Sequence, residues 1–145
     1  MTLTISSKLA ETIVNSTVTQ LGSGVAEPNT RLIVWSGQMP TTADMTVEAS
    51  CKMLIDVMLP NPAFGAAAVI GNTVEALAFA VPQIESLDTG EASFFRLYDR
   101  EGDVCIQGSV SDDPDAPAPL MLNQTMLYPG ASVTIERLVV GIPLI

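Results

Sequence analysis

Residues Ala92 to Val110 read ASFFRLYDREGDVCIQGSV, with two runs of strand-forming residues on either side of the polar turn DREGD at 99–103. Valine, isoleucine, phenylalanine and tyrosine favour strands, and proline is absent from the whole stretch. Two such runs around a short polar turn with a glycine predict a β-hairpin whose turn faces solvent. Nothing in this hairpin has the composition of a catalytic site, so the stretch indicates a scaffold.

Further strand-like runs lie on both sides of the hairpin, at a spacing of roughly ten residues that is typical of a two-sheet sandwich. One of them, Ala63 to Ile70, is ambiguous between a helical turn and a strand, and we favour the strand. In the last run the apolar phase changes near Glu136 and Arg137, which predicts a β-bulge. The predicted strands outside the hairpin are Arg31–Trp35, Cys51–Leu59, Ala63–Ile70, Thr73–Val81, Leu120–Asn123 and Ser132–Val140.

The run Cys51 to Leu59 has the clearest two-residue period in the chain. Its odd-numbered positions are all apolar, whereas Lys52 and Asp56 lie on the other side, so we expect one buried face. Leu54 and Met58 fall on the mostly polar side. Two apolar residues there predict partial cover by a loop or by a neighbouring subunit.

Residues Ser7 to Leu21 are the single candidate helix, because apolar residues recur there at spacings of three, four and seven. The recurring residues are Leu9, Ile13, Val14, Val18 and Leu21. Ser6 or Ser7 can cap the first turn. Gly22 and Gly24 are expected to end the helix with positive φ angles. We expect this helix to pack on the end of the β domain, in preference to a partner-binding arm.

These elements predict one domain, because 145 residues is the usual size of a single core and no internal repeat is present. We expect residues 1–145 to form an all-β fold. The predicted architecture is a two-sheet, jelly-roll-like β-sandwich of about eight strands with one short N-terminal helix at about residues 7–21.

The composition restricts the function. With 16 acidic and 6 basic residues the net charge is −10, which argues against a nucleic-acid partner. The absence of histidine excludes Ser-His-Asp and Cys-His catalysis. The hydrophobic share is 48% and the charged share only 15%, so we expect part of the surface to be buried against a partner.

The two cysteines, Cys51 and Cys105, lie in apolar runs and are expected to be buried free thiols, since two cysteines make no disulfide framework. No stretch has the length of an apolar membrane span or the pattern of a secretion signal. The sequence therefore predicts a soluble, unsecreted chain without a membrane partner.

Acidic residues are the remaining candidates for chemistry. The loop Asp112–Asp115 could hold a hard cation, but its spacing matches no calcium loop, and a solvated turn is the favoured interpretation. Other carboxylates are scattered, and no nucleophile stands beside a recognisable base. We expect no catalytic residues, no cofactor and no metal site.

Partner contacts are a better prospect than catalysis. Trp35, the only tryptophan, stands beside a turn, where a lid on the core is favoured over a binding platform. Arg96 could pair with an acidic partner; the favoured interpretation is that its stem covers apolar surface while its head reaches Asp99 or Asp103. The candidate contact residues are Trp35, Leu54, Met58, Phe64 and Arg96.

Four stretches carry a resemblance to a known family. They are RLIVWSGQMP at 31–40, LPNPAFGAAA at 59–68, GEASFFRLYDREGDVCIQGSV at 90–110 and LMLNQTMLYPGASVTIERLVV at 120–140. In this order they resemble a family of small structural proteins encoded in the head-gene clusters of tailed bacteriophages and prophages. The resemblance covers nearly the whole chain, and the hairpin is its signature.

The resemblance implies a non-enzymatic jelly-roll cement, or decoration, protein of the virion. Such a protein is made in the host bacterial cytoplasm, binds the outer surface of the phage head and bridges neighbouring major capsid proteins. The implied partners are the major capsid protein and a second copy of the chain, in a homodimer first and a trimer next. The acidic balance suits an outer-surface protein, which need not neutralise packaged DNA.

Two alternatives remain open at this point. The first is a tail, collar or head-fibre component of the same kind of virus, because jelly-roll modules recur there. The second is a carbohydrate-binding β-sandwich, with Trp35, Tyr98 or Tyr128 as stacking platforms.

Overall fold

The structure, a computed structural model, describes residues 3–81 and 83–144. The helix and the β-hairpin have the positions that the sequence predicts. The elements are α1 (Ser7–Leu21), β1 (Arg31–Trp35), β2 (Met53–Met58), β3 (Ala68–Ile70), β4 (Thr73–Leu77), β5 (Ile84–Glu85), β6 (Gly90–Glu91), β7 (Phe94–Tyr98), β8 (Val104–Ser111), β9 (Leu120–Leu122), β10 (Met126–Leu127), β11 (Ser132–Val133) and β12 (Ile135–Pro143).

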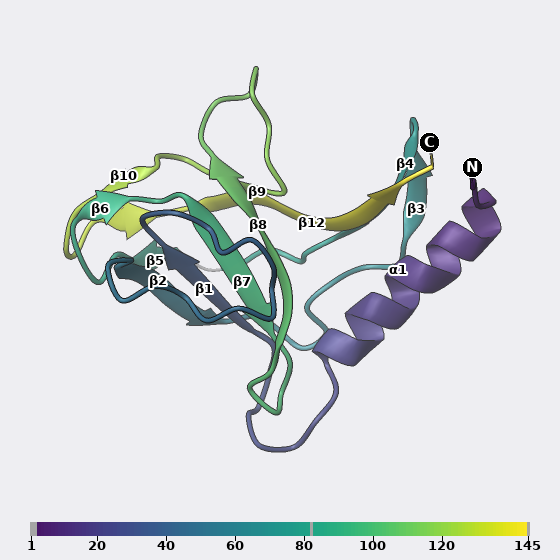
Figure 1. Cartoon of the computed structure of the whole chain (residues 1–145), viewed down its shortest axis with the longest axis horizontal. Coiled ribbons are helices and arrows are strands. Elements are labelled where there is room, and N and C mark those ends of the chain that lie inside the picture. Colours follow the sequence, from purple (N-terminus) through teal and green to yellow (C-terminus); the bar gives the residue numbers. More distant parts are fainter. Residues whose placement is uncertain (1–2, 82, 145) are drawn as a thin grey trace.

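Eight strands form one sheet in the order β2-β1-β7-β8-β9-β12-β4-β3, and β10-β6 and β11-β5 form two small sheets. Neighbouring strands are antiparallel except β8 and β9, which are parallel. Figure 1 shows β3, β4 and α1 on one side of the molecule and β1, β2, β5, β6 and β10 on the other. The predicted all-β, sandwich-like fold is confirmed, although one long sheet and two ribbons take the place of two separate sheets.

The larger of two hydrophobic clusters joins the two halves of the long sheet. Leu32 and Leu97 enter it from β1 and β7, and Leu120 and Leu138 enter it from β9 and β12. All four side chains are fully or almost fully buried, and each contributes about 1.5–3 kcal/mol by leaving water. The strongly curved sheet is therefore held together by the apolar face that its strands share.

The turn of the β7–β8 hairpin forms hydrogen bonds within itself and with another segment of the chain. The turn positions Gly102 at φ 87°. The Asp99 carboxylate is buried and accepts from the backbone N–H groups of Glu101 and Asp103, at 2.9 and 3.0 Å. Glu101 in turn accepts from the Val25 N–H. Glu101, Gly102 and Asp103 are exposed, as predicted, whereas Asp99 is buried and the turn also holds the segment after α1.

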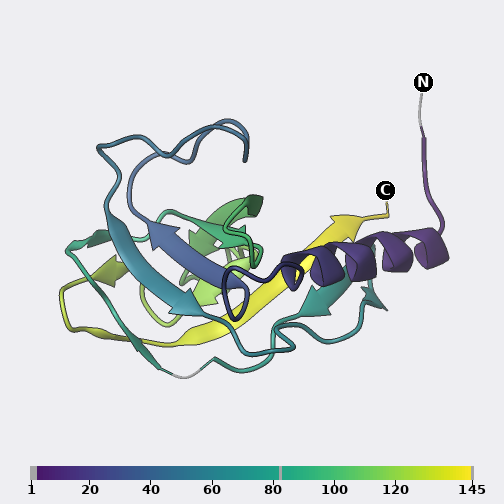
Figure 2. The ribbon, with the colours of Figure 1, turned by 90° about the horizontal axis from the view of Figure 1, so that it is seen from below.

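Helix α1 has the predicted bounds, and the Ser6 hydroxyl accepts from the Leu9 N–H at 3.1 Å, as a cap. Its buried face agrees with the predicted one in part. Val14 and Leu21 are buried and Val18 packs against the core, as predicted, whereas Leu9 and Ile13 stay 48% and 40% exposed and Ala10 is buried in their place. The helix contacts β4 and β12. Figure 2 shows the helix along this edge of the sheet. Several apolar stripes fit the helical period, and the position of the sheet selects among them.

The end of α1 also differs from the prediction. Gly22 has a φ of −86°, within the range of any residue, and only Gly24, at 112°, has the positive φ expected of both. The Thr30 hydroxyl donates to the Leu21 carbonyl at 2.9 Å. Thr30 directly precedes β1, so a side chain from outside the helix gives this carbonyl at the end of α1 its hydrogen-bond donor.

Strand β2 breaks the alternation that its sequence predicts. Trp35 pairs with Met53 and Val34 pairs with Ile55, so Leu54 is an extra residue at a β-bulge. The bulge turns Leu54 into the core, where it is fully buried, and leaves Met53 40% exposed. The prediction that Leu54 lies on a partly covered polar side is wrong for this reason.

The strands near the C-terminus follow the sequence more closely. The register between β9 and β12 shifts between Ile135 and Arg137, which confirms the predicted bulge. Two other predicted strands are shorter: β3 covers only Ala68–Ile70, and β4 ends at Leu77. An isolated bridge pairs Phe64, which precedes β3, with Ala78, which follows β4.

Candidate functional site

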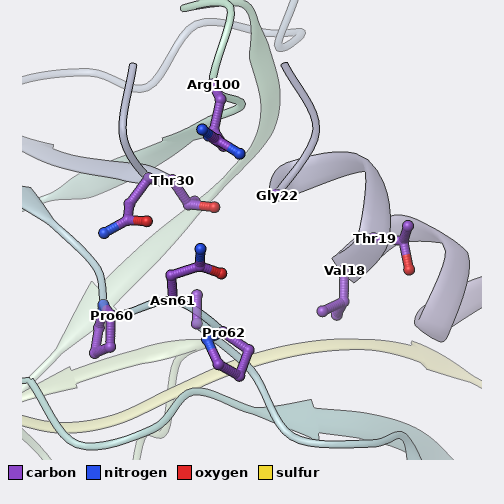
Figure 3. A pocket seen from close by; sticks show the side chains of 10 residues that line it. Val18, Thr19, Gly22, Thr30, Pro60, Asn61, Pro62 and Arg100 are labelled. Atoms are coloured by element: carbon purple, nitrogen blue, oxygen red, sulfur yellow. The ribbon is translucent and has the colours of Figure 1, made fainter. Parts of the chain in front are cut away.

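A small hollow of about 220 Å³ lies beside the C-terminal end of α1. Figure 3 shows the Arg100 guanidinium on one side of it and Asn61, between two prolines, on the other. The Nε of Arg100 donates to the Glu27 carbonyl at 2.8 Å. The lining holds no carboxylate, thiol or amine, so no residue there can serve as a base for the Thr30 hydroxyl. The hollow therefore lacks the parts of a catalytic site.

Arg96, a predicted contact residue, is only 3% exposed and lies on the outer face of the sheet. Its Nε and Nη2 donate to Gln107 Oε1, and Nη2 also donates to the carbonyls of Thr42 and Met45. Gln107 Nε2 donates to the Pro40 carbonyl at 2.7 Å. Arg96 thus holds the loop 36–52 on the sheet. The expectations that it meets an acidic partner, or Asp99 or Asp103, are wrong.

Trp35 is buried under the same loop. Its ring stacks on Phe94 with 5.5 Å between the ring centroids and an interplanar angle of 15°. Ile33 completes this second apolar cluster, and Val47 and Cys51 of the loop pack against it. The interpretation of Trp35 as a lid is supported, and its candidate role as a contact or stacking platform is wrong, because the loop 36–52 covers it.

The other candidate contacts divide by burial. Leu54 and Phe64 are core residues, and neither can meet a partner without opening the fold. Met58, at the end of β2, is partly exposed, so it alone of the five candidates keeps accessible surface. Sequence patterns did not show that the loop 36–52 lies over β1 and β7, which buries Trp35 and Arg96, or that β2 has a bulge, which buries Leu54.

Exposed apolar side chains occur on both sides of the molecule: Met53, Leu87 and Met126 lie on the side of β2, β5 and β10, and a further group lies around α1, β3 and β4. We call Val69, Ile70, Leu77 and Phe79 together the β3–β4 surface; each is between 44% and 49% exposed, and the neighbours Val69 and Ile70 point to opposite faces of the strand pair. Leu9 and Ile13 add the outer face of α1. Large and small residues alternate in the sequence from 73 to 81, a pattern typical of a strand that another sheet or chain approaches on one side.

The arginines leave little positive charge free for a ligand. Arg31 pairs with Asp56 at 2.9 Å, and Arg137 pairs with Glu75 at 2.8 Å. The N–H groups of Arg96 donate to backbone carbonyls and to Gln107, as described above. The surface that remains is therefore predominantly acidic, in line with the net charge of −10.

The two groups with shifted titration are poor nucleophiles. Burial, followed by the charge of the nearby Asp99, raises the pKa of the Cys105 thiol. Burial likewise raises the pKa of the Tyr98 hydroxyl, against an opposing effect of Arg96. Both groups are protonated at neutral pH, and a thiol or phenol in that form attacks slowly.

The acidic loop is exposed, and two of its carboxylates accept hydrogen bonds from nearby groups. Asp112 accepts from both the N–H and the hydroxyl of Thr125, each at 3.1 Å, and Asp113 accepts from the Asp115 N–H. Across residues 3–81 and 83–144, no group of three or more Cys, Asp or Glu residues is placed to hold a metal ion. The loop geometry is that of hydrogen-bonded turns.

No helix in the described part of the chain is long and apolar enough to cross a membrane. Comparison of the chain with known protein families, curated proteins and solved structures finds no match.

Proposed function

We propose that the chain is a non-enzymatic virion protein that binds the outer surface of a tailed-bacteriophage head. In this role it bridges neighbouring major capsid proteins and stabilises the shell. The single observation that carries the proposal is the apolar surface around α1, β3 and β4, which residues 3–81 and 83–144 leave about half exposed. The sequence resemblance to small phage head proteins supplies the kind of partner.

The distribution of charge supports the same role. An acidic protein with few free cations is suited to the outside of a particle, away from the packaged DNA. A cement protein also needs a rigid body with one adhesive side, since its work is to hold two neighbours at a fixed distance. The covered side, built from β1, β2 and β7 and closed by the loop 36–52, provides such a body.

The test is to heat phage heads with and without the purified chain and to follow release of DNA. We expect the heads that carry the chain to survive to a higher temperature. Equal stability, together with an absence of binding, would overturn the proposal. Counting copies separates the alternatives, because a shell protein approaches the copy number of the major capsid protein, whereas a collar or tail component is present in far fewer copies.

Two matched variants assign the binding side. Phe79→Asp places a charge on the β3–β4 surface, and Tyr128→Asp does so at an aromatic residue on the other side, where exposure is comparable, 49% against 56%. We expect Phe79→Asp to abolish binding to heads and Tyr128→Asp to retain it. Equal binding by both variants would contradict the assignment of the apolar side. The homodimer expected from the sequence stays a prediction, which sedimentation of the purified chain tests.

A further inference from the structure

The long sheet has a gap between β8 and β12. Strand β9 joins the two only over a short distance, pairing with Val110 and Ser111 of β8 and with residues 135–138 of β12. Beyond this point β8 and β12 diverge, as Figure 1 shows. In the described part of the chain, the pairing partners of Val104 to Ser109 all lie on the β7 side, and those of Val140 to Pro143 all lie on the β4 side.

Two open strand edges therefore face each other across this gap. An open edge presents a row of backbone N–H and C=O groups that can pair with another extended chain. The chain's own continuation is kept out of this row, because the residues before β9 read Ala116-Pro117-Ala118-Pro119. A proline has no N–H to give to a sheet. The Pro119 carbonyl does accept from the Val139 N–H at 3.0 Å, which is where the row stops.

The gap is a real groove, with a volume of about 430 Å³. Its inner wall is apolar, with Val14 of α1, Phe95 of β7 and Ile106 of β8. Its outer rim carries Gln107 and Glu75. A strand in this groove would thus place alternate side chains on an apolar wall and on a polar rim.

We propose that this groove binds an extended segment of another protein, apolar at alternate positions and neutral or basic in between, which adds a strand between β8 and β12. Glu75 is the one charged side chain in the lining, and Arg137 pairs with its carboxylate at 2.8 Å, so the charge that a ligand meets is that of the chain as a whole, −10. This net charge favours a neutral or basic segment over a second copy of the chain. The inference rests on the proposed function in one respect, since it takes the segment to come from the shell.

Hydrogen exchange on the full chain tests this directly, without any variant. The amides of 104–109 that point away from β7, and those of 140–142 that point away from β4, should exchange fast in the free chain. We expect them to become protected when the chain is bound to phage heads. Binding to heads that leaves these amides unprotected would overturn the groove and leave the proposed function standing.

A probe peptide keeps the inference testable if heads do not bind. The synthetic peptide Lys-Val-Thr-Val-Lys-Val-Thr alternates apolar and polar residues, and two comparison peptides carry glutamate for lysine or proline for the central valine. We expect protection of the same amides by the first peptide and binding about tenfold weaker or worse for the other two. Failure of all three to protect the groove edges would contradict the inference.

A pair of threonine variants on α1 provides the matched control. Thr17 lines the groove, Thr19 does not, and each hydroxyl donates to the carbonyl four residues earlier at 2.9 Å. Thr17→Trp should fill the groove and weaken peptide binding by about tenfold or more, and Thr19→Trp should bind as the original chain does. If the edges are instead protected by self-association that Thr17→Trp abolishes, the occupant is a second copy and the proposal is wrong.

Discussion

The two sides of the molecule differ in how far their apolar residues are covered. On the side of β1, β2 and β7, both faces of the sheet are covered, one by the core and one by the loop 36–52 over Trp35 and Phe94. On the side of α1, β3, β4 and β12, one face is covered, and the β3–β4 surface and two strand edges stay open. The first side supplies stability. The second presents apolar area that only another molecule can bury.

The largest predicted effect comes from the contrast between Phe94 and Phe79. Phe94 is fully buried against Trp35, and Phe79 is about half exposed. We expect Phe94→Ala to lower the free energy of unfolding by about 3–5 kcal/mol, because it leaves a cavity under the loop. Phe79→Ala should change it by about 0.5 kcal/mol or less. Urea unfolding measures both, and comparable losses would remove the distinction between the two sides.

The next effect concerns the attachment of the loop 36–52. Arg96→Met removes the donors to Thr42 and Met45, and we expect a loss of about 2–3 kcal/mol in the free energy of unfolding. Arg137→Met, which breaks a surface pair with Glu75, should cost at most about 1 kcal/mol. Limited proteolysis gives a second readout: cleavage within 41–50 should accelerate only in Arg96→Met. Unchanged cleavage would show that the loop is held by other contacts.

A smaller effect is expected at the hairpin turn. Asp99→Ala leaves the N–H groups of Glu101 and Asp103 without their acceptor, which should cost about 1–2 kcal/mol. Asp113→Ala removes a similar bond from an exposed turn and should lower the free energy of unfolding by about a few tenths of a kcal/mol. Thermal unfolding compares the two. Equal shifts would mean that burial of Asp99 adds nothing to the value of its bonds.

The smallest effect is a dependence of stability on pH. The pKa values of Cys105 and Tyr98 are raised above 9.0 and 10.0 in the folded chain, so folding favours their protonated forms. Their contribution is complete below pH 9.0 and is lost as the pH rises through the raised values. We expect the free energy of unfolding to fall above that pH. The double variant Cys105→Ser, Tyr98→Phe should reduce this fall, and Tyr128→Phe should not; an identical fall in both would contradict the assignment.

The parts of the fold that the sequence predicts are those fixed by neighbours along the chain. The hairpin follows from two runs and a turn, and the bounds of α1 follow from Ser6 and Gly22. Features set by distant pairing were not predictable. Leu54 turns inward because β1 shifts register against β2, and α1 buries Ala10 because β4 and β12 lie on that side.

The same limit explains the candidate site. Arg96 and Trp35 look accessible in a strand pattern, and only the folded loop 36–52 shows that they are buried. The groove arises because β8 and β12 diverge, which no single stretch encodes. Its one local signal is the proline pair at 117 and 119, which keeps the chain out of its own sheet.

The most direct test of the account is the position of the chain in a reconstruction of the phage particle. We predict density for it on the outer surface of the head, at a copy number close to that of the major capsid protein, with α1 and the β3–β4 surface toward the shell. Density at the collar or tail, or an orientation with the loop 36–52 toward the shell and the β3–β4 surface in solvent, would contradict the account.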